Sequence, residues 1–347
     1  MLNDLINNCL QSQYHDDYRD KRIAGPNYRI EHTSKYIYTN VVSSSRGCPY
    51  QCDFCYNSAA GSVPYINRPI NAVLEDIYAI GKRHILFIDD NFCGNPKWTM
   101  DFLDALVGLN IKWSAAVCSD IVTRPALLDK MKESGCQSLF IGFESINPVS
   151  LQKVHKTQNN VDLYEKLVDE LHARGIMINA SLVFGLPDDD AHTFSRTLEW
   201  LLRHKIETAT AHIMTPYPGT KFYEQMLVQG KIIDHDLSHY DTAHVVFQHE
   251  RMAEREIYEG YLNFYRQLYS FRNIFHRLPN DKNQWIPYLC FNLFYRKFGR
   301  FSEGLSQIVP LNTLGRLAAY LSYHTGKLKK NKTAISKDAS QEKSAGI

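Results

Sequence analysis

The feature that most constrains the fold of this chain is an alternation of short apolar runs with longer segments of helical spacing. In residues 161–175, for example, Leu163, Leu167 and Leu171 fall on one helical face. The runs predicted as strands are 36–42, 84–89, 112–118, 137–143, 177–185 and 208–214, and the segments predicted as helices are 71–82, 96–109, 124–135, 161–175 and 190–205. Repeated strand–helix units predict a parallel sheet, either open and doubly wound or curled into a barrel. In both cases, functional groups belong at the carboxyl ends of the strands.

Composition narrows the class of protein further. The chain has 347 residues, of which 44% are hydrophobic and 22% charged, and its net charge is +2. These values are typical of a globular protein and argue against nucleic acid as a partner. Because no stretch looks like a signal peptide or a spanning helix, we expect a cytoplasmic protein. We predict an N-terminal extension (1–34), a core barrel (35–220), a mainly helical C-terminal extension (221–325) and a disordered tail (326–347).

Three of the eight cysteines are crowded into eight residues. Cys48, Cys52 and Cys55 have the spacing C-x3-C-x2-C and directly follow the first predicted strand. Soft thiolates suit zinc or an iron–sulfur cluster, and closed sites of both kinds take four ligands. One alternative is a zinc loop that takes Cys93 or His84 as its fourth ligand. The other is a three-thiolate cluster with one iron open to a further ligand.

Together with Phe54 just before the third cysteine, this spacing resembles the radical S-adenosylmethionine (radical SAM) superfamily. RGCPYQCDFC, FIDDNFCGN, WSAAVCSD, IGFES and LVFGLPDDD, in this order, resemble the radical SAM half of the cobalamin-binding, BchE-like group over about residues 30–275. The resemblance implies an α/β fold, a partial (β/α)6 TIM-like barrel with a helical C-terminal extension. It also implies a [4Fe–4S] cluster on Cys48, Cys52 and Cys55, SAM on the open iron, and an electron donor such as a flavodoxin or ferredoxin.

The same resemblance suggests which residues contact SAM, and each has a structural alternative. The candidates are Phe54, Asp90, Asn91, Glu144 and Gly185. Asp90 could instead cap a helix or order a loop, and Glu144 could form a salt bridge with Arg124 or Lys112. Gly185 could simply satisfy a turn. We assign no residue a direct catalytic role.

The reaction type stays open between three hypotheses. The first is an enzyme that cleaves SAM to a 5′-deoxyadenosyl radical, which acts on an organic substrate. BchE-like proteins carry an upstream cobalamin domain, whereas 47 residues precede Cys48 and no D-x-H-x-x-G stretch is present. The second hypothesis, a cobalamin-dependent methyltransferase, would therefore take cobalamin from a partner chain. The third hypothesis is a non-catalytic iron–sulfur protein.

The apolar segments 285–295 and 308–323 fit either packing inside the protein, or a lid or membrane-surface patch for a lipid-like substrate.

Overall fold

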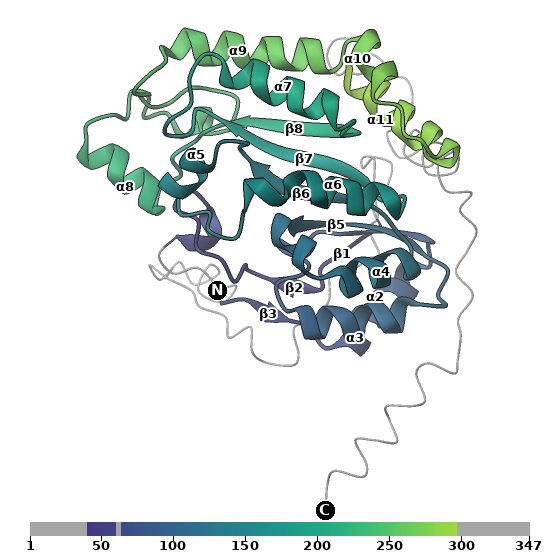
Figure 1. Ribbon diagram of the computed structural model, residues 1–347. Helices are drawn as coiled ribbons and strands as arrows, with labels where there is room; N and C mark the ends of the chain where they lie inside the picture. The colour runs from purple at the N-terminus through teal and green to yellow at the C-terminus, as the bar shows by residue number, and fades with distance from the viewer. Residues whose placement is uncertain (1–39, 60–63, 297–347) are drawn as a thin grey trace, which may run out of the picture.

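The computed structural model describes residues 40–59 and 64–296, and a six-stranded parallel sheet is at its centre (Figure 1). The strand order β1-β4-β5-β6-β7-β8 follows the sequence, and each neighbouring pair is parallel. The strands are β1 (Val41–Val42), β4 (His84–Phe87), β5 (Lys112–Cys118), β6 (Cys136–Glu144), β7 (Met177–Phe184) and β8 (Thr208–Ile213). Consecutive parallel strands joined by helices give a progressive strand–helix series, which is what the sequence rhythm predicts.

Helices connect the strands and continue beyond the last of them. Those between strands are α2 (Ile70–Ile80), α3 (Pro96–Leu106), α4 (Pro125–Glu133), α5 (Pro148–Lys153), α6 (Tyr164–Ala173) and α7 (Thr193–Arg203). Those after β8 are α8 (Lys221–Val228), α9 (Glu254–Leu268), α10 (Phe271–His276) and α11 (Trp285–Arg296). Single 3-10 turns occupy Tyr56–Ser58, Ser119–Thr123, Val161–Leu163, Leu237–His239 and Lys282–Gln284.

The five predicted helices are all present, within a few residues at their ends. Local signals explain several of these ends. The Asn95 side chain caps α3 by accepting the Trp98 N–H at 3.2 Å, with Pro96 in the first turn. Gly135, just after α4, has φ +100°, and a Cβ there would clash with the Ile111 carbonyl. The sequence did not reveal α5 or the antiparallel pair β2 (Ser45–Arg46) and β3 (Ile66–Asn67), which are too short to show a period.

Side chains alternate between the two faces of the sheet, apart from register shifts at Trp113/Ser114 and Gly142/Glu144. In β5, Trp113, Ala115 and Val117 are buried in the main apolar core, whereas Ser114 and Cys118 belong to the opposite face. The opposite face carries small and polar residues along several strands, including Ser138, Asn179, Ser181, Thr210 and His212. The helices therefore cover an apolar outer face, and a mainly polar inner face remains for ligands.

Among the helices after β8, α9 packs against α7 and β8 on the outer face of the sheet. Figure 1 shows α9 beside α7, and the hydroxyls of Tyr265 and Tyr269 donate to the carbonyls of Ala211 and Ala209 at 2.9 and 2.7 Å. The boundaries at 34, 220 and 325 remain predictions, and both the segment 308–323 and the tail 326–347 lie outside the described residues.

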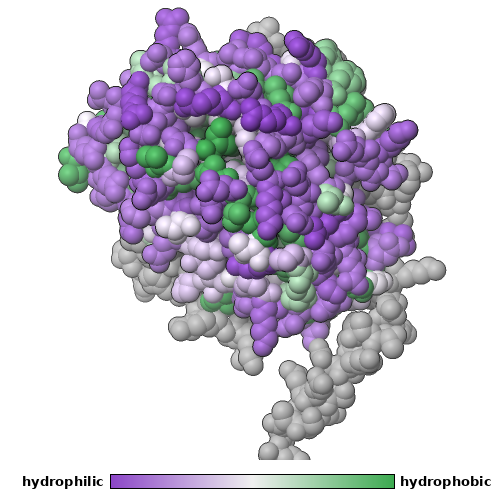
Figure 2. Space-filling view, viewed as in Figure 1, coloured by the Kyte–Doolittle hydropathy of each residue, from purple (hydrophilic) through white to green (hydrophobic). Residues whose placement is uncertain are grey.

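On the face shown in Figure 2, apolar side chains occur in small groups. The face in Figure 2 is mainly hydrophilic, and the apolar residues left exposed include Ile286 and Phe291 on α11. No helix in residues 40–59 and 64–296 combines the length and the apolar character needed to cross a bilayer.

Candidate functional site

The cysteine loop is held at the carboxyl end of the sheet by Asp89, which follows β4. This buried carboxylate accepts from the backbone N–H of Ser44 at 2.8 Å, from the N–H of Ser45, and from both serine hydroxyls. Burial raises the pKa of Asp89, and these four donors oppose the rise. Since β1 pairs with β4, the contacts fix the start of the loop against its neighbouring strand. Asp89 is therefore a loop-ordering residue.

A second buried carboxylate, Asp53, anchors the middle of the same loop. Its N–H donates to the carbonyl of Val154 at 3.1 Å, and its own carbonyl accepts the N–H of Phe222 at 3.0 Å. Its side chain pairs with His155 Nδ1 at 2.6 Å. The loop is thus tied to α5 on one side and to α8 on the other, two elements far apart in the sequence.

Each thiol of the loop has its own hydrogen-bond donors. The Cys52 sulfur is buried and accepts from Gln158 Nε2 at 3.3 Å. Burial raises the pKa of Cys55 to about 11, and a hydrogen bond from the backbone of Asn57 partly offsets this rise. Donors of this kind stabilise thiolates, which are the metal-binding form of cysteine.

Cys48 differs from the other two thiols because it has more donors. The pKa of Cys48 is lowered to about 7, chiefly by a hydrogen bond with the Cys118 thiol, although burial alone would raise it. Hydrogen bonds from the backbone of Tyr50 and the side chain of Asn91 lower this pKa further. In return, the hydrogen bond and burial raise the pKa of Cys118. Cys118 was not among the predicted site residues, and the inward position of alternate β5 residues is the signal that points to it.

The donor set fits a cluster with three protein ligands. The sulfurs lie close enough that Cys48 adds to the raised pKa of Cys52, and both Cys48 and Cys52 add to the raised pKa of Cys55. In the part of the chain that the structure describes, no three His, Cys, Asp or Glu side chains converge on a single metal ion. A four-iron cluster instead takes one thiolate per iron, so its ligands surround a larger centre. His84 begins β4 at the opposite end of that strand from the loop, which argues against its role as a fourth ligand.

Glu144 ends β6 in a buried ion pair with Lys156. The two head groups are 2.8 Å apart, and their side chains are 10% and 7% exposed. Burial opposes the charge of Lys156, but Glu144 and the nearby sulfurs of Cys118 and Cys52 outweigh it and raise the pKa of Lys156. Glu144 has φ +60°, at a register shift of β6 against β7, and it also accepts from Ser181 Oγ at 3.4 Å. Strained backbone at a buried charge is typical of functional sites.

The partners considered for Glu144 on sequence grounds are wrong. Arg124 pairs with Asp120 at 2.9 Å, and Lys112 lies at the start of β5, at the other end of the sheet. Lys156 follows α5 in a polar loop whose sequence shows no pattern. Its position depends on the fold that brings this loop beneath the cysteines, so the sequence offered no signal for it.

Three further residues predicted to contact SAM, Phe54, Asp90 and Asn91, lie near the cysteines in different environments. Phe54 packs against a separate apolar cluster behind the loop, and Lys156 Nζ lies 5.9 Å from its ring centroid. Asp90 is exposed and accepts from the Tyr56 hydroxyl at 2.5 Å. Asn91 is buried, and its Oδ1 accepts the N–H of Cys93 at 3.2 Å. Asp90 thus faces solvent, whereas Phe54 and Asn91 lie against the candidate site.

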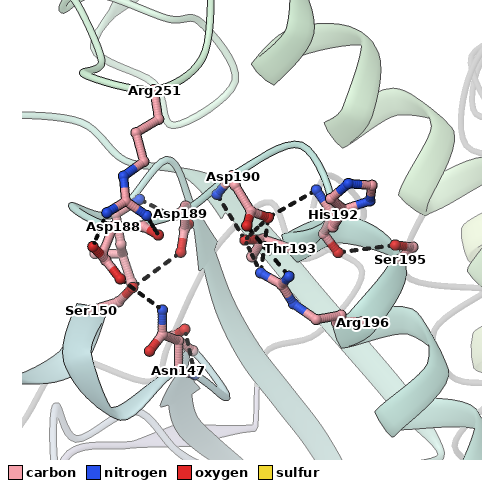
Figure 3. Close-up of polar contacts among 12 residues, drawn as sticks. Asn147, Ser150, Asp188, Asp189, Asp190, His192, Thr193, Ser195, Arg196 and Arg251 are labelled. Carbon is pink, nitrogen blue, oxygen red and sulfur yellow. Dashed lines mark hydrogen bonds and ion pairs between the residues drawn. The ribbon is translucent and has the colours of Figure 1, made fainter.

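Gly185 directly follows β7, on a loop organised by Asp189, whose contact with Ser150 is drawn in Figure 3. The backbone N–H groups of Gly185 and Leu186 each donate to Asp189 Oδ2 at 3.0 Å, and Ser150 Oγ donates to Oδ1 at 3.2 Å. Burial raises the pKa of Asp189 to about 7. At φ +84°, Gly185 holds a turn that side-chain-bearing residues rarely adopt, so the turn alternative accounts for its type.

Asp188, the next acidic residue in Figure 3, ties this loop to other elements. It pairs with Arg251 at 2.6 Å and with Lys153 at 3.1 Å. Lys153 ends α5, and Arg251 precedes α9. The loop is therefore fixed from two sides.

Comparisons with known proteins agree with this geometry. Residues 42–201 match the family described as the radical SAM superfamily. The chain is 29% identical over 274 residues to bacteriochlorophyllide d C-12(1)-methyltransferase of Chlorobaculum tepidum, covering 77% of this chain and 60% of that enzyme. It is 27% identical over 238 residues to hopanoid C-2 methylase of Rhodopseudomonas palustris, covering 66% of this chain and 45% of the methylase. The chain thus spans less than two thirds of the length of both relatives.

Solved structures give the same fold. The cobalamin-dependent S-adenosylmethionine radical enzyme OxsB, determined with aqua-cobalamin bound, superimposes with a TM-score of 0.53 at 16% identity. The match covers 88% of this chain and 50% of OxsB. The likeness confirms the predicted partial TIM-like barrel.

Proposed function

Since the chain contains a radical SAM domain that is homologous to radical SAM methyltransferases, we propose that it reductively cleaves SAM and uses the resulting radical on a small organic molecule. The observation that carries this proposal is the placement of three loop cysteines beside a buried Glu144–Lys156 pair at the carboxyl end of one parallel sheet. Both parts lie where a strand–helix barrel places its chemistry.

In this proposal, Cys48, Cys52 and Cys55 hold a [4Fe–4S] cluster. When bound, the reduced cluster supplies the electron that cleaves the sulfonium of SAM to methionine and a 5′-deoxyadenosyl radical. The chain's own contribution is to hold the three thiolates and to exclude water around them. Asp89 and Asp53 fix the loop that carries the ligands, and Gln158 donates to one of the sulfurs.

SAM would lie over the inner ends of β6 and β7. Lys156 would attract its carboxylate, and Glu144 would accept from its ammonium group or ribose hydroxyls. Phe54 and Asn91 flank the same space, and Gly185 lies at the next strand end. Asp90 is kept as a candidate because a rotation of its exposed side chain away from Tyr56 frees the carboxylate.

The experiment is a measurement of cluster content and SAM cleavage under anaerobic conditions. We expect about four iron and four sulfide per chain, together with 5′-deoxyadenosine and methionine after chemical reduction in the presence of SAM. Cys52→Ala should lose both, whereas Cys136→Ala, a buried cysteine at the far end of β6, should keep both. Zinc in place of iron, or SAM cleavage by Cys52→Ala, would refute the proposal.

A cobalamin-dependent methyl transfer is a second candidate, favoured by the methyltransferase names of the relatives. In that case cobalamin would come from a partner chain or from sequence outside this chain. Addition of cobalamin, SAM and an organic methyl acceptor to the reduced protein should then yield S-adenosylhomocysteine and the methylated acceptor. A cluster that binds no SAM after reduction would instead support an iron–sulfur protein without catalysis.

Partners follow from the same chemistry. Reduction of the cluster needs an external electron donor, and a flavodoxin or ferredoxin supplies single electrons at low potential in the cytoplasm.

A lipid-like substrate and contact with a membrane surface are supported by the exposed Ile286 and Phe291 of α11. Co-sedimentation with anionic vesicles, compared with Ile286→Ser and Phe291→Ser variants, tests this contact.

A further inference from the structure

We propose that His212, near the carboxyl end of β8, recognises the substrate: its Nε2 forms a hydrogen bond with a carbonyl or hydroxyl oxygen of an uncharged organic molecule. This role of His212 rests on the proposed function and names the class of molecule on which the radical acts. None of the sequence motifs includes His212, because a lone histidine within a strand shows no pattern.

The alternation along β8 places the His212 side chain on the inner face of the sheet. Ala209, Ala211 and Ile213 are buried in the main apolar core. Thr210 and His212 therefore point to the other side of the strand. Both are half-buried, so the imidazole is accessible from the inner side of the sheet.

The strand register brings His212 near the proposed SAM site. His212 is aligned with Val183 on β7, and the preceding residue of β7, Leu182, is aligned with Glu144 on β6. Since neighbouring strands lie about 4.8 Å apart, the backbones of His212 and Glu144 are about 10 Å apart. A molecule that contacts His212 can thus reach the space over the Glu144–Lys156 pair, where we place SAM.

One ring nitrogen of His212 is available to such a molecule, whereas other polar side chains of the inner face bond to one another. Three such pairs are Ser114 with Ser138 at 2.8 Å, Thr210 with Asn179 at 3.3 Å, and Ser181 with Glu144 at 3.4 Å. His212 Nδ1 lies 2.9 Å from the Thr242 hydroxyl. Within residues 40–59 and 64–296, no group forms a hydrogen bond with its Nε2.

Thr242 is the positioning residue for this ring. Its carbonyl accepts the N–H of Ile213 at 2.7 Å, and its φ of +67° is uncommon for a β-branched residue. Because the Thr242 hydroxyl can donate or accept, both neutral tautomers of His212 are compatible with it, and Nε2 can donate to a carbonyl or accept from a hydroxyl. Burial lowers the pKa of His212, which favours the neutral ring and hence an uncharged partner.

Toward β4 the inner face becomes apolar. Leu86 and Phe140 are half-buried there, and Ile88, just after β4, is 54% exposed. Among the described strand residues of this face, those with charged side chains, Lys112 and Glu144, lie at strand ends. This distribution suits an uncharged molecule whose apolar part lies toward β4 and whose oxygen lies at β8.

The test compares two probes of similar shape, 1-indanone and indane, which differ by one carbonyl group. Calorimetric titration of the anaerobically reconstituted protein gives a dissociation constant for each. His212→Leu should weaken the binding of 1-indanone about five- to tenfold, because one hydrogen bond is lost, and leave the binding of indane unchanged. His212→Gln, whose amide can still donate and accept, should retain most of the affinity for 1-indanone.

His276→Leu is the matched control. His276 is exposed on α10, next to Arg277, whose side chain bonds to the carbonyl of Ile206 before the start of β8. This substitution lies at the opposite end of β8 from His212 and should change neither dissociation constant. Thr242→Val keeps the side-chain shape without the hydroxyl, so it should reduce the preference for 1-indanone over indane.

Diethyl pyrocarbonate locates the bound probe, because it carbethoxylates accessible neutral imidazoles. The tryptic peptide 206–221 contains His212 and no other histidine, so mass spectrometry of this peptide reports the reaction rate at this residue. A saturating concentration of 1-indanone should slow the reaction at His212.

An unchanged preference for 1-indanone over indane in His212→Leu would overturn the inference. Equal losses of affinity for both probes would also overturn it, because they would mark a merely structural effect, and so would a reaction rate at His212 that 1-indanone does not slow. The proposed function fails on a different result, an unsubstituted chain that assembles no cluster or cleaves no SAM. That result would remove the substrate role of His212 even if both probes bind.

Discussion

The Glu144–Lys156 pair gives the most quantitative test of the site, through the substitution Lys156→Met. At 2.8 Å and an effective dielectric constant of about 20, the attraction between the two charges is about 6 kcal/mol. Desolvation of both ions cancels much of this gain. Removal of one partner from a buried pair nevertheless costs about 3–5 kcal/mol, because the other charge stays buried without compensation. We therefore expect Lys156→Met to lower the free energy of unfolding by about 3–5 kcal/mol.

Lys231→Met is the matched control. Lys231 also lies 2.8 Å from its partner, Glu250, but that carboxylate is 68% exposed, so the pair contributes about 1 kcal/mol or less. The assay is urea unfolding followed by tryptophan fluorescence on anaerobically purified protein. In a Glu144→Gln background, no buried carboxylate is left alone, and the cost of Lys156→Met should fall to about 1–2 kcal/mol. Equal effects of the two lysine substitutions, or additive effects of Lys156→Met and Glu144→Gln, would refute this reasoning.

Three further predictions concern the loops and strand ends around this pair. Asp89→Ala leaves two buried backbone N–H groups unpaired and should cost about 2–4 kcal/mol in urea unfolding, with a parallel loss of iron per chain. The pKa of Asp189 is raised to about 7, so between about pH 4 and 7 the folded protein binds more protons at this site than the unfolded chain does. The free energy of unfolding should therefore fall as pH rises through this window. Asp189→Asn should flatten this pH dependence in urea unfolding measured from pH 5 to 8. Gly142→Ala places a Cβ 2.6 Å from Glu144 Oε1, and calorimetric titration should show weaker SAM binding to the reduced protein.

The sequence predicted the strands and helices well because period and length encode them locally. The β5 run 112–118 coincides with the observed strand, and the other predicted strand ends lie within about a residue or two where the structure describes them. The elements it missed are short. The β2–β3 pair has two residues per strand, and α5 has six, so neither shows a hydrophobic period.

The candidate site was predictable only where its residues are close in sequence. Cys48, Cys52 and Cys55 stand out because they share one loop. Lys156 and Cys118 do not stand out, since a lone lysine and a lone cysteine have no pattern. Both reach the site through the fold: α5 returns the chain beneath the cysteine loop, and the pleat of β5 turns Cys118 inward.

Non-local contacts also decide which carboxylate orders the loop and which remains available to a ligand. Asp89 and Asp90 are adjacent, and the sequence favoured Asp90 for SAM without a means to separate their environments. The pairing of β1 with β4 brings Ser44 and Ser45 to Asp89, and four donors then fix that carboxylate within the protein. The adjacent Asp90 is exposed, and its side chain accepts one hydrogen bond, from the hydroxyl of Tyr56. Because a carboxylate with four internal donors has little capacity left for a ligand, Asp89 is a poor candidate for contact with SAM, and the role of Asp90 stays a prediction.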